Sequence, residues 1–115
     1  MGAIYTPENS AVIALTRNDK YIAAAVIYEF IGNSCQIQVA GIKYWAKREF
    51  VKTVFSACFD QLKVKKVLAL IDSENSKSIK LAKHCGMIEE SIVKDAGRYA
   101  DLCIYSMTRE QCRYL

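Results

Sequence analysis

The chain has 115 residues and a formal net charge of +4, with 52% hydrophobic and 24% charged residues. This length predicts one domain over residues 1–115 with a hydrophobic core, and the composition is too apolar for a disordered chain. The longest apolar run, residues 21–28, is far shorter than the roughly 20 residues that cross a bilayer, so we expect no membrane span. Five cysteines, odd in number and without metal-ligand spacing, favour a reducing compartment, and we expect no signal peptide.

The first third of the chain predicts three antiparallel strands. After a loosely packed lead-in over residues 1–10, apolar segments predict strands at residues 11–16, 21–30 and 35–40. The segments are separated by Asn-Asp and Gly-Asn pairs, which favour tight turns because these residues tolerate positive φ angles. The three strands should therefore form a meander that leads into the rest of the fold.

A crossover unit follows this meander. Apolar residues three and four apart predict an amphipathic helix over residues 46–62, with Leu62 on its buried face. Residues 66–71 predict a strand, and within it residues 67–71 are apolar on both faces, as in a parallel strand buried by helices. We expect this strand to pair in parallel with residues 35–40 through a right-handed crossover.

The remaining residues predict one more helix and two more strands. The helix should begin near residue 73, after a run of N-cap residues, and should end at Gly86, which suits a left-handed C-terminal position. Residues 87–93 and 102–107 then read as strands. The predicted order is β-β-β-α-β-α-β-β, an α/β (α+β) mixed sheet.

Basic residues surround the start of the first predicted helix. Lys43, Lys47, Arg48 and Lys52 bracket this helix end, with Glu49 against them. Free N–H groups and the positive end of the helix dipole favour an anion there, so the run predicts a phosphate site. The alternative is that these side chains form a solvated helix face. Nearby, Tyr44 and Trp45 suit packing or a cleft wall better than base stacking.

Three stretches of sequence carry a family resemblance. Residues 75–90 contain an Asn-x-x-Ser start and a Cys-Gly-Met-Ile-Glu-Glu end, residues 59–67 form a Phe-x-x-Leu junction, and residues 101–113 run Asp-Leu-Cys-Ile-Tyr-Ser-Met-Thr-Arg-Glu-Gln-Cys-Arg. Together they resemble the GCN5-related N-acetyltransferase (GNAT) superfamily, and the last resembles the ending of small phage-encoded acetyltransferase-like proteins. The resemblance implies a GNAT-like sheet with a splayed parallel strand pair, and without the N-terminal helices that usually cover the acceptor side.

The resemblance also implies an activity. Members of this family transfer an acetyl group from acetyl-CoA, as co-substrate, to an amine that attacks the thioester directly, without a metal. The acceptor would be a small molecule or a protein. The family's usual general-acid tyrosine would fall near Ala82 and is absent here, so Tyr105, on the last predicted strand, is the candidate thiolate protonator by default. The implied cofactor-binding residues are Gln38, Val39, Ala40, Lys47, Arg48, Asn75 and Ser78. A backbone N–H near Val39 would polarise the thioester carbonyl, whereas Asn75 alternatively serves only as a helix cap.

Two departures from the family pattern leave an alternative open. Residues 43–50 contain no glycine where the family's phosphate loop has several, and Glu49 would repel a pyrophosphate. The alternative is therefore a catalytically inactive GNAT-fold protein with a structural (virion) or host-interaction role in a phage. A nucleic-acid-binding module is the least favoured hypothesis, because the net charge is modest.

We expect a cytoplasmic location, which for a phage protein means the host cytoplasm or the virion. We also expect that a homodimer is one way to close the acceptor groove.

Overall fold

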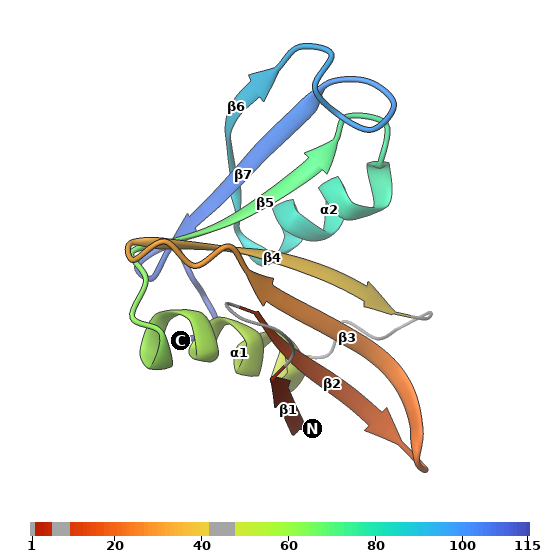
Figure 1. Cartoon of the computed structure of the whole chain (residues 1–115), viewed down its shortest axis with the longest axis vertical. Helices are drawn as coiled ribbons and strands as arrows, with labels where there is room; N and C mark the ends of the chain where they lie inside the picture. The colour runs from red at the N-terminus through yellow and green to blue at the C-terminus, as the bar shows by residue number, and fades with distance from the viewer. Residues whose placement is uncertain (1, 6–9, 42–47) are drawn as a thin grey trace.

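The computed structural model describes residues 2–5, 10–41 and 48–115, and its strands form one seven-stranded mixed sheet in the order β1-β2-β3-β4-β5-β7-β6 (Figure 1). The mixed sheet confirms the predicted fold class. The elements are β1 (Gly2–Tyr5), β2 (Ala11–Arg17), β3 (Lys20–Tyr28), β4 (Ser34–Gly41), α1 (Arg48–Ser56), a π-helical turn η1 (Ala57–Gln61), β5 (Lys66–Asp72), α2 (Ser76–Cys85), β6 (Ile88–Val93) and β7 (Leu102–Thr108).

The N-terminal meander has one strand more than the sequence predicts. Residues 2–5 form β1, which pairs antiparallel with β2 from Gly2 opposite Ala14 to Tyr5 opposite Ala11. The expectation of a loosely packed lead-in is wrong at these residues, because a four-residue strand is too short to show a clear alternation. The predicted turn between β2 and β3 is confirmed, with positive φ angles of 53° at Asn18 and 63° at Asp19.

The predicted parallel pair is confirmed, and it is short. β4 and β5 pair in parallel at three positions, from Ser34 opposite Lys66 to Gln36 opposite Leu68. Beyond these positions the strands diverge, as Figure 1 shows, although β4 continues to Gly41. Each strand keeps its outer neighbour over its remaining length, β4 with β3 and β5 with β7. The sheet is therefore divided into two halves that meet only at the base of this pair.

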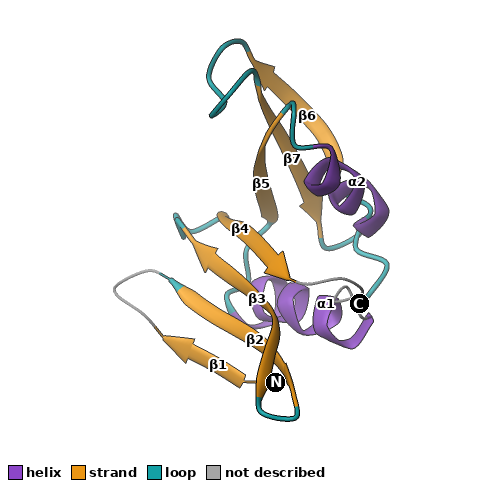
Figure 2. Cartoon of the chain, turned by 90° about the vertical axis from the view of Figure 1, so that its right-hand side faces the viewer, coloured by secondary structure: helices purple, strands orange, loops and turns teal. Residues whose placement is uncertain are grey.

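The hydrophobic core lies on one face of the sheet. On β5 the buried residues are Val67, Ala69 and Ile71, and their partners across β7 are also buried. The buried residues of α1 and α2 belong to the same core, with α1 against the half that holds β1 to β4 and α2 against the other half (Figure 2). The expectation that residues 66–71 are covered on both sides is wrong, since Leu70 is 38% exposed.

The end of the first helix also differs from the prediction. The chain passes from α1 into η1, where the N–H of Leu62 donates to the carbonyl of Ala57 at 3.0 Å, a bond across five residues. This wider turn changes which side chains face the core, so that Phe59 is buried beside Cys58. Leu62 is 38% exposed, and its predicted burial is wrong.

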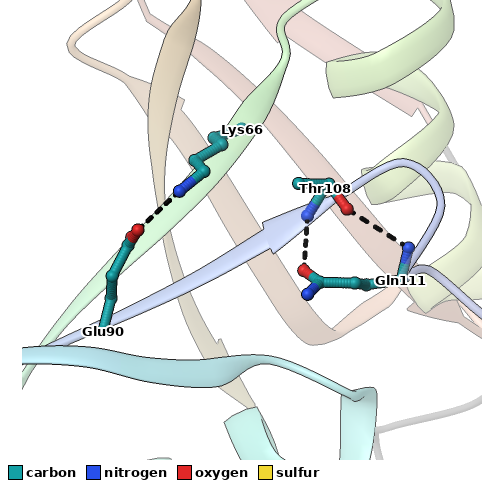
Figure 3. Close-up of polar contacts among 4 residues, drawn as sticks. All are labelled: Lys66, Glu90, Thr108 and Gln111. Carbon is teal, nitrogen blue, oxygen red and sulfur yellow. Dashed lines mark hydrogen bonds and ion pairs between the residues drawn. The ribbon is translucent and has the colours of Figure 1, made fainter.

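Polar contacts lie at the start of β5 and at the end of β7 (Figure 3). Lys66 Nζ lies 2.5 Å from Glu90 Oε1, and this pair reaches across β7, which separates β5 from β6. At the end of β7, the Thr108 N–H donates to Gln111 Oε1 at 2.9 Å, and the Gln111 N–H donates to Thr108 Oγ1 at 3.3 Å. Both residues of the ion pair are exposed, so its contribution to stability is small.

The Asp72 carboxylate holds the connection between β6 and β7 against the end of β5. Asp72, the last residue of β5, accepts the N–H groups of Tyr99 at 2.7 Å and Ala100 at 3.0 Å on Oδ2, and that of Glu74 at 2.9 Å on Oδ1. These backbone donors hold the pKa of Asp72 below its ordinary value. Gly97 packs so close to Asp72 Oδ2 that a Cβ would collide with it. The loop is therefore fixed against the start of α2.

The one-sided core predicts unequal costs for truncating two similar side chains. Met107→Ala should lower the free energy of unfolding by about 2–5 kcal/mol, because Met107 is 0% exposed. Leu70→Ala should lower it by only about 1 kcal/mol, since much of this side chain already contacts solvent. Urea denaturation of both variants measures the difference. Equal losses would mean that the second face of β5 is covered as well.

The Asp72 contacts predict a pH-dependent loop. Because its pKa is depressed in the folded protein, the stabilising effect of Asp72 is present above the ordinary pKa of about 3.9 and is lost as the pH falls through the lower folded value. Asp72→Ala should speed hydrogen exchange at the Tyr99 and Ala100 amides near neutral pH. Glu110→Ala, which removes an exposed carboxylate outside the loop, is the control. Unchanged exchange in Asp72→Ala would contradict this role.

Candidate functional site

A cavity of about 300 Å³ lies where β4 and β5 diverge. Its lining comes from both strands, from β3, from α1 and from α2, so the split in the sheet forms its centre. Ile37 and Val39 line it from β4, and Ala69 and Ile71 line it from β5. These four side chains point to the helix-covered face, because they lie two or four residues after the buried residues Cys35 and Val67 on the same strands.

The cavity also reaches the opposite face of the sheet. Gln38 and Leu70 line it as well, and they alternate with the helix-facing residues on their strands. Tyr28, at the end of β3, lines it from the same open face, since its register partner is Gln36. Side chains from both faces of β4 and β5 therefore surround one space. Residues of the helix-covered face and residues of the open face therefore line the same cavity.

Polar groups line the cavity at the start of α2. Asp72, Asn75 and Ser78 are among its lining residues. Asn75 is the N-cap of α2, and its Oδ1 accepts the Ser78 N–H at 3.3 Å. The capping interpretation of Asn75 is thus confirmed, and the same residue lies at the cavity. The structure brings together four of the predicted cofactor residues here, namely Gln38, Val39, Asn75 and Ser78.

Two of the other predicted cofactor residues, Ala40 and Arg48, are not among the residues that line the cavity. Ala40 is exposed on β4 and does not line the cavity. Arg48 begins α1, and its guanidinium lies over the Tyr114 ring at 5.5 Å from the centroid, which is a cation–π contact. Lys47, with the rest of the basic loop at residues 42–47, lies outside the described residues. The phosphate site therefore stays a prediction from the sequence.

Tyr105 is buried beneath the helices instead of lining the cavity. It is 1% exposed, and its hydroxyl donates to Glu89 Oε2 at 3.2 Å. Burial, with the Glu89 carboxylate as a second cause, raises the pKa of Tyr105. Glu89 belongs to β6, on the far side of β7 from the cavity, so the hydroxyl points away from the β4–β5 split.

Tyr28 is the cavity-lining phenol that the sequence did not single out. Desolvation, with the neighbouring Glu29 carboxylate as a second cause, raises its pKa, so the hydroxyl stays protonated near neutral pH. Its partner Gln36 is the last β4 residue that pairs with β5, which places Tyr28 beside the point of divergence. The β3–β4 register contains this information, but the sequence alone does not fix that register.

Three further features concern the part of the chain that the structure describes. It contains no group of three or more His, Cys, Asp or Glu residues able to hold a metal ion. None of the helices described there has the length and apolar character to cross a membrane. All five cysteines are buried and free, as the sequence predicts.

Comparisons with known proteins agree with this geometry. A family model described as "Acetyltransferase (GNAT) domain" matches residues 4–88. A SpeG spermidine N-acetyltransferase variant from Vibrio cholerae superposes with a TM-score of 0.77 at 19% identity, covering 95% of this chain and 70% of that chain. A dodecameric spermidine N-acetyltransferase from Vibrio cholerae gives 0.77 at 17% identity, with 91% and 68% coverage. No curated protein sequence matches the chain.

The structural neighbours are too distant in sequence to show more than the fold. The family match is different in kind, because it spans well over half of the chain and includes both strands of the splayed pair. It agrees with the resemblance carried by residues 75–90, most of which it covers. The chain therefore belongs to the GNAT acetyltransferase family.

Proposed function

We propose that this protein is an N-acetyltransferase that transfers the acetyl group of acetyl-CoA to an amine. The observation that carries the proposal is the cavity between β4 and β5, which residues from both faces of the sheet line. A reaction between two substrates needs a space that both can enter, and we infer that each substrate reaches this cavity from a different face. Acetyl-CoA would approach from the helix-covered side, and the amine would approach from the open side.

The strand edges inside the split suit the arm of acetyl-CoA. Beyond Gln36 and Leu68 the ladder between β4 and β5 ends, while each strand still pairs on its outer side. One edge of each strand therefore faces the gap, and such edges offer N–H and C=O groups to an extended partner. The two amides of a pantetheine arm can pair with these groups as an added strand would. The pyrophosphate is assigned to the start of α1, with Lys47 and Arg48.

The acetyl transfer would depend on how the two reactants are positioned in the split. The amine nitrogen attacks the thioester carbon, a C–N bond forms, the C–S bond breaks, and the amine loses one proton while the CoA thiolate gains one. A backbone N–H near Val39 would stabilise the oxyanion, and holding both reactants in the split supplies most of the acceleration. Tyr28 is the better-placed proton donor, because it lines the cavity whereas the Tyr105 hydroxyl is bonded to Glu89.

Filling the cavity should abolish acetyl-CoA binding. Ser78 lines the cavity from α2, so Ser78→Trp should remove the increase in melting temperature that acetyl-CoA gives the wild type. At 100 times Kd that increase corresponds to about 2.7 kcal/mol. Lys80→Trp, at an exposed position of α2 outside the cavity lining, is the matched control and should keep it. Absence of stabilisation in the wild type at millimolar ligand would favour the inactive alternative.

The two tyrosines give opposite expectations in a kinetic test. Tyr28→Phe should lower kcat by about 10²-fold, the lower end of the range for general acid–base catalysis, and should leave the acetyl-CoA stabilisation intact. Tyr105→Phe should retain most of the activity, because its hydroxyl points to β6. Steady-state release of free CoA thiol measures both. The reverse pattern would restore Tyr105 as the proton donor.

A further inference from the structure

The open-face side of the cavity is lined by uncharged side chains. Tyr28, Gln38 and Leu70 reach the cavity from this face, contributing a phenol, an amide and an alkyl group. Under the proposed function this is where the amine enters. The chemistry of these residues therefore selects among amines.

The described lining contains one charged side chain, and its carboxylate already accepts hydrogen bonds. Among the described residues that line the cavity, only Asp72 has an ionisable carboxylate. That carboxylate accepts three backbone N–H groups, from Glu74, Tyr99 and Ala100. An ammonium group that bound Asp72 would compete with the contacts that hold the β6–β7 loop.

Two other carboxylates near the open face do not complete a cation site. Glu90 is paired with Lys66 at 2.5 Å. Glu29 lies close enough to influence Tyr28 but is not among the cavity-lining residues. The described part of the lining thus offers no unbonded carboxylate to a cation.

A cation that enters this cavity meets no unbonded carboxylate in the described lining. Moving an ammonium group from water into apolar surroundings is costly unless an opposite charge pairs with it. A polyamine carries several ammonium groups, whereas a monoamine that reacts in its neutral form carries none at the moment of attack. Apolar surface on the monoamine would in turn be buried against Leu70 and Tyr28.

We propose that the acceptor is a primary monoamine attached to an apolar body, and not a polyamine. The inference rests on the proposed function and goes beyond it by naming the substrate class. It also separates this chain from the spermidine N-acetyltransferases whose fold it shares. The attacking nitrogen is neutral when it forms the amide bond. The C–S bond of the thioester breaks, the amine nitrogen loses one proton, and the CoA thiolate gains one.

The direct test compares two amines with the wild-type protein. Phenethylamine is the apolar monoamine probe and spermidine is the polyamine probe, both at saturating acetyl-CoA, with release of the CoA thiol as readout. We expect kcat/KM to be higher for phenethylamine by about tenfold or more, the scale on which a pocket separates ligands that differ in burial and pairing. Equal values, or a preference for spermidine, would overturn the inference.

Added charge at the cavity should shift this preference. Gln38→Glu is isosteric and places a carboxylate on an exposed, cavity-lining position, so it should move the phenethylamine-to-spermidine ratio toward spermidine. A new general base would raise both rates and leave the ratio unchanged. Gln36→Glu adds the same charge to the same strand face outside the lining, and should change the ratio much less. A ratio unmoved by Gln38→Glu would contradict the inference.

Two results separate failure of the inference from failure of the proposed function. If spermidine is the better substrate and Glu29→Gln removes that preference, Glu29 binds polyamines, the inference is wrong and the acetyltransferase proposal stands. If neither amine reacts and acetyl-CoA gives no thermal stabilisation, the proposed function is wrong and the inference falls with it.

Discussion

Parallel pairing between β4 and β5 lasts only from Ser34 to Gln36, and beyond it each strand follows a different neighbour. β4 remains paired with β3 as far as Gly41, and β5 remains paired with β7 as far as Asp72. The hydrogen bonds on these outer edges hold the strands apart, so the gap is maintained by the same ladders that build the two halves of the sheet. The cavity, its lining from both faces of the sheet and the strand edges that face the gap all follow from this divergence.

The hydrophobic core lies on one face of the sheet, so the other face is left in contact with solvent. Both helices pack on the side of Val67 and Met107, which are 0% exposed. The opposite side of β5 carries Leu70 in contact with solvent and with the cavity. An apolar surface that no described helix covers is suited to meet a substrate with an apolar body. The one-sided core therefore connects the stability of the fold with the choice of acceptor.

Local patterns were sufficient for much of the fold. Alternation, turn residues and helix caps predicted the meander, the crossover unit and the end of α2 at Gly86. Strand β1 was missed because it is short, and the other two errors have tertiary causes: the π turn exposes Leu62, and the missing cover exposes Leu70. For the site, the motif-based residues on β4 and α2 do meet at one cavity. The sequence singled out Tyr105 and not Tyr28 because both are strand tyrosines in it, and only the strand order shows that Tyr28 lies beside the gap.

The central claim is that acetyl-CoA occupies the split between β4 and β5. The most direct measurement is a titration of the isotope-labelled protein with CoA, followed by amide chemical shifts in two-dimensional NMR. If acetyl-CoA occupies the split, the largest changes should fall on residues 37–39, 69–72 and 75–78 and on the start of α1, with small changes in β2. Changes concentrated elsewhere, or none at saturating CoA, would contradict this claim.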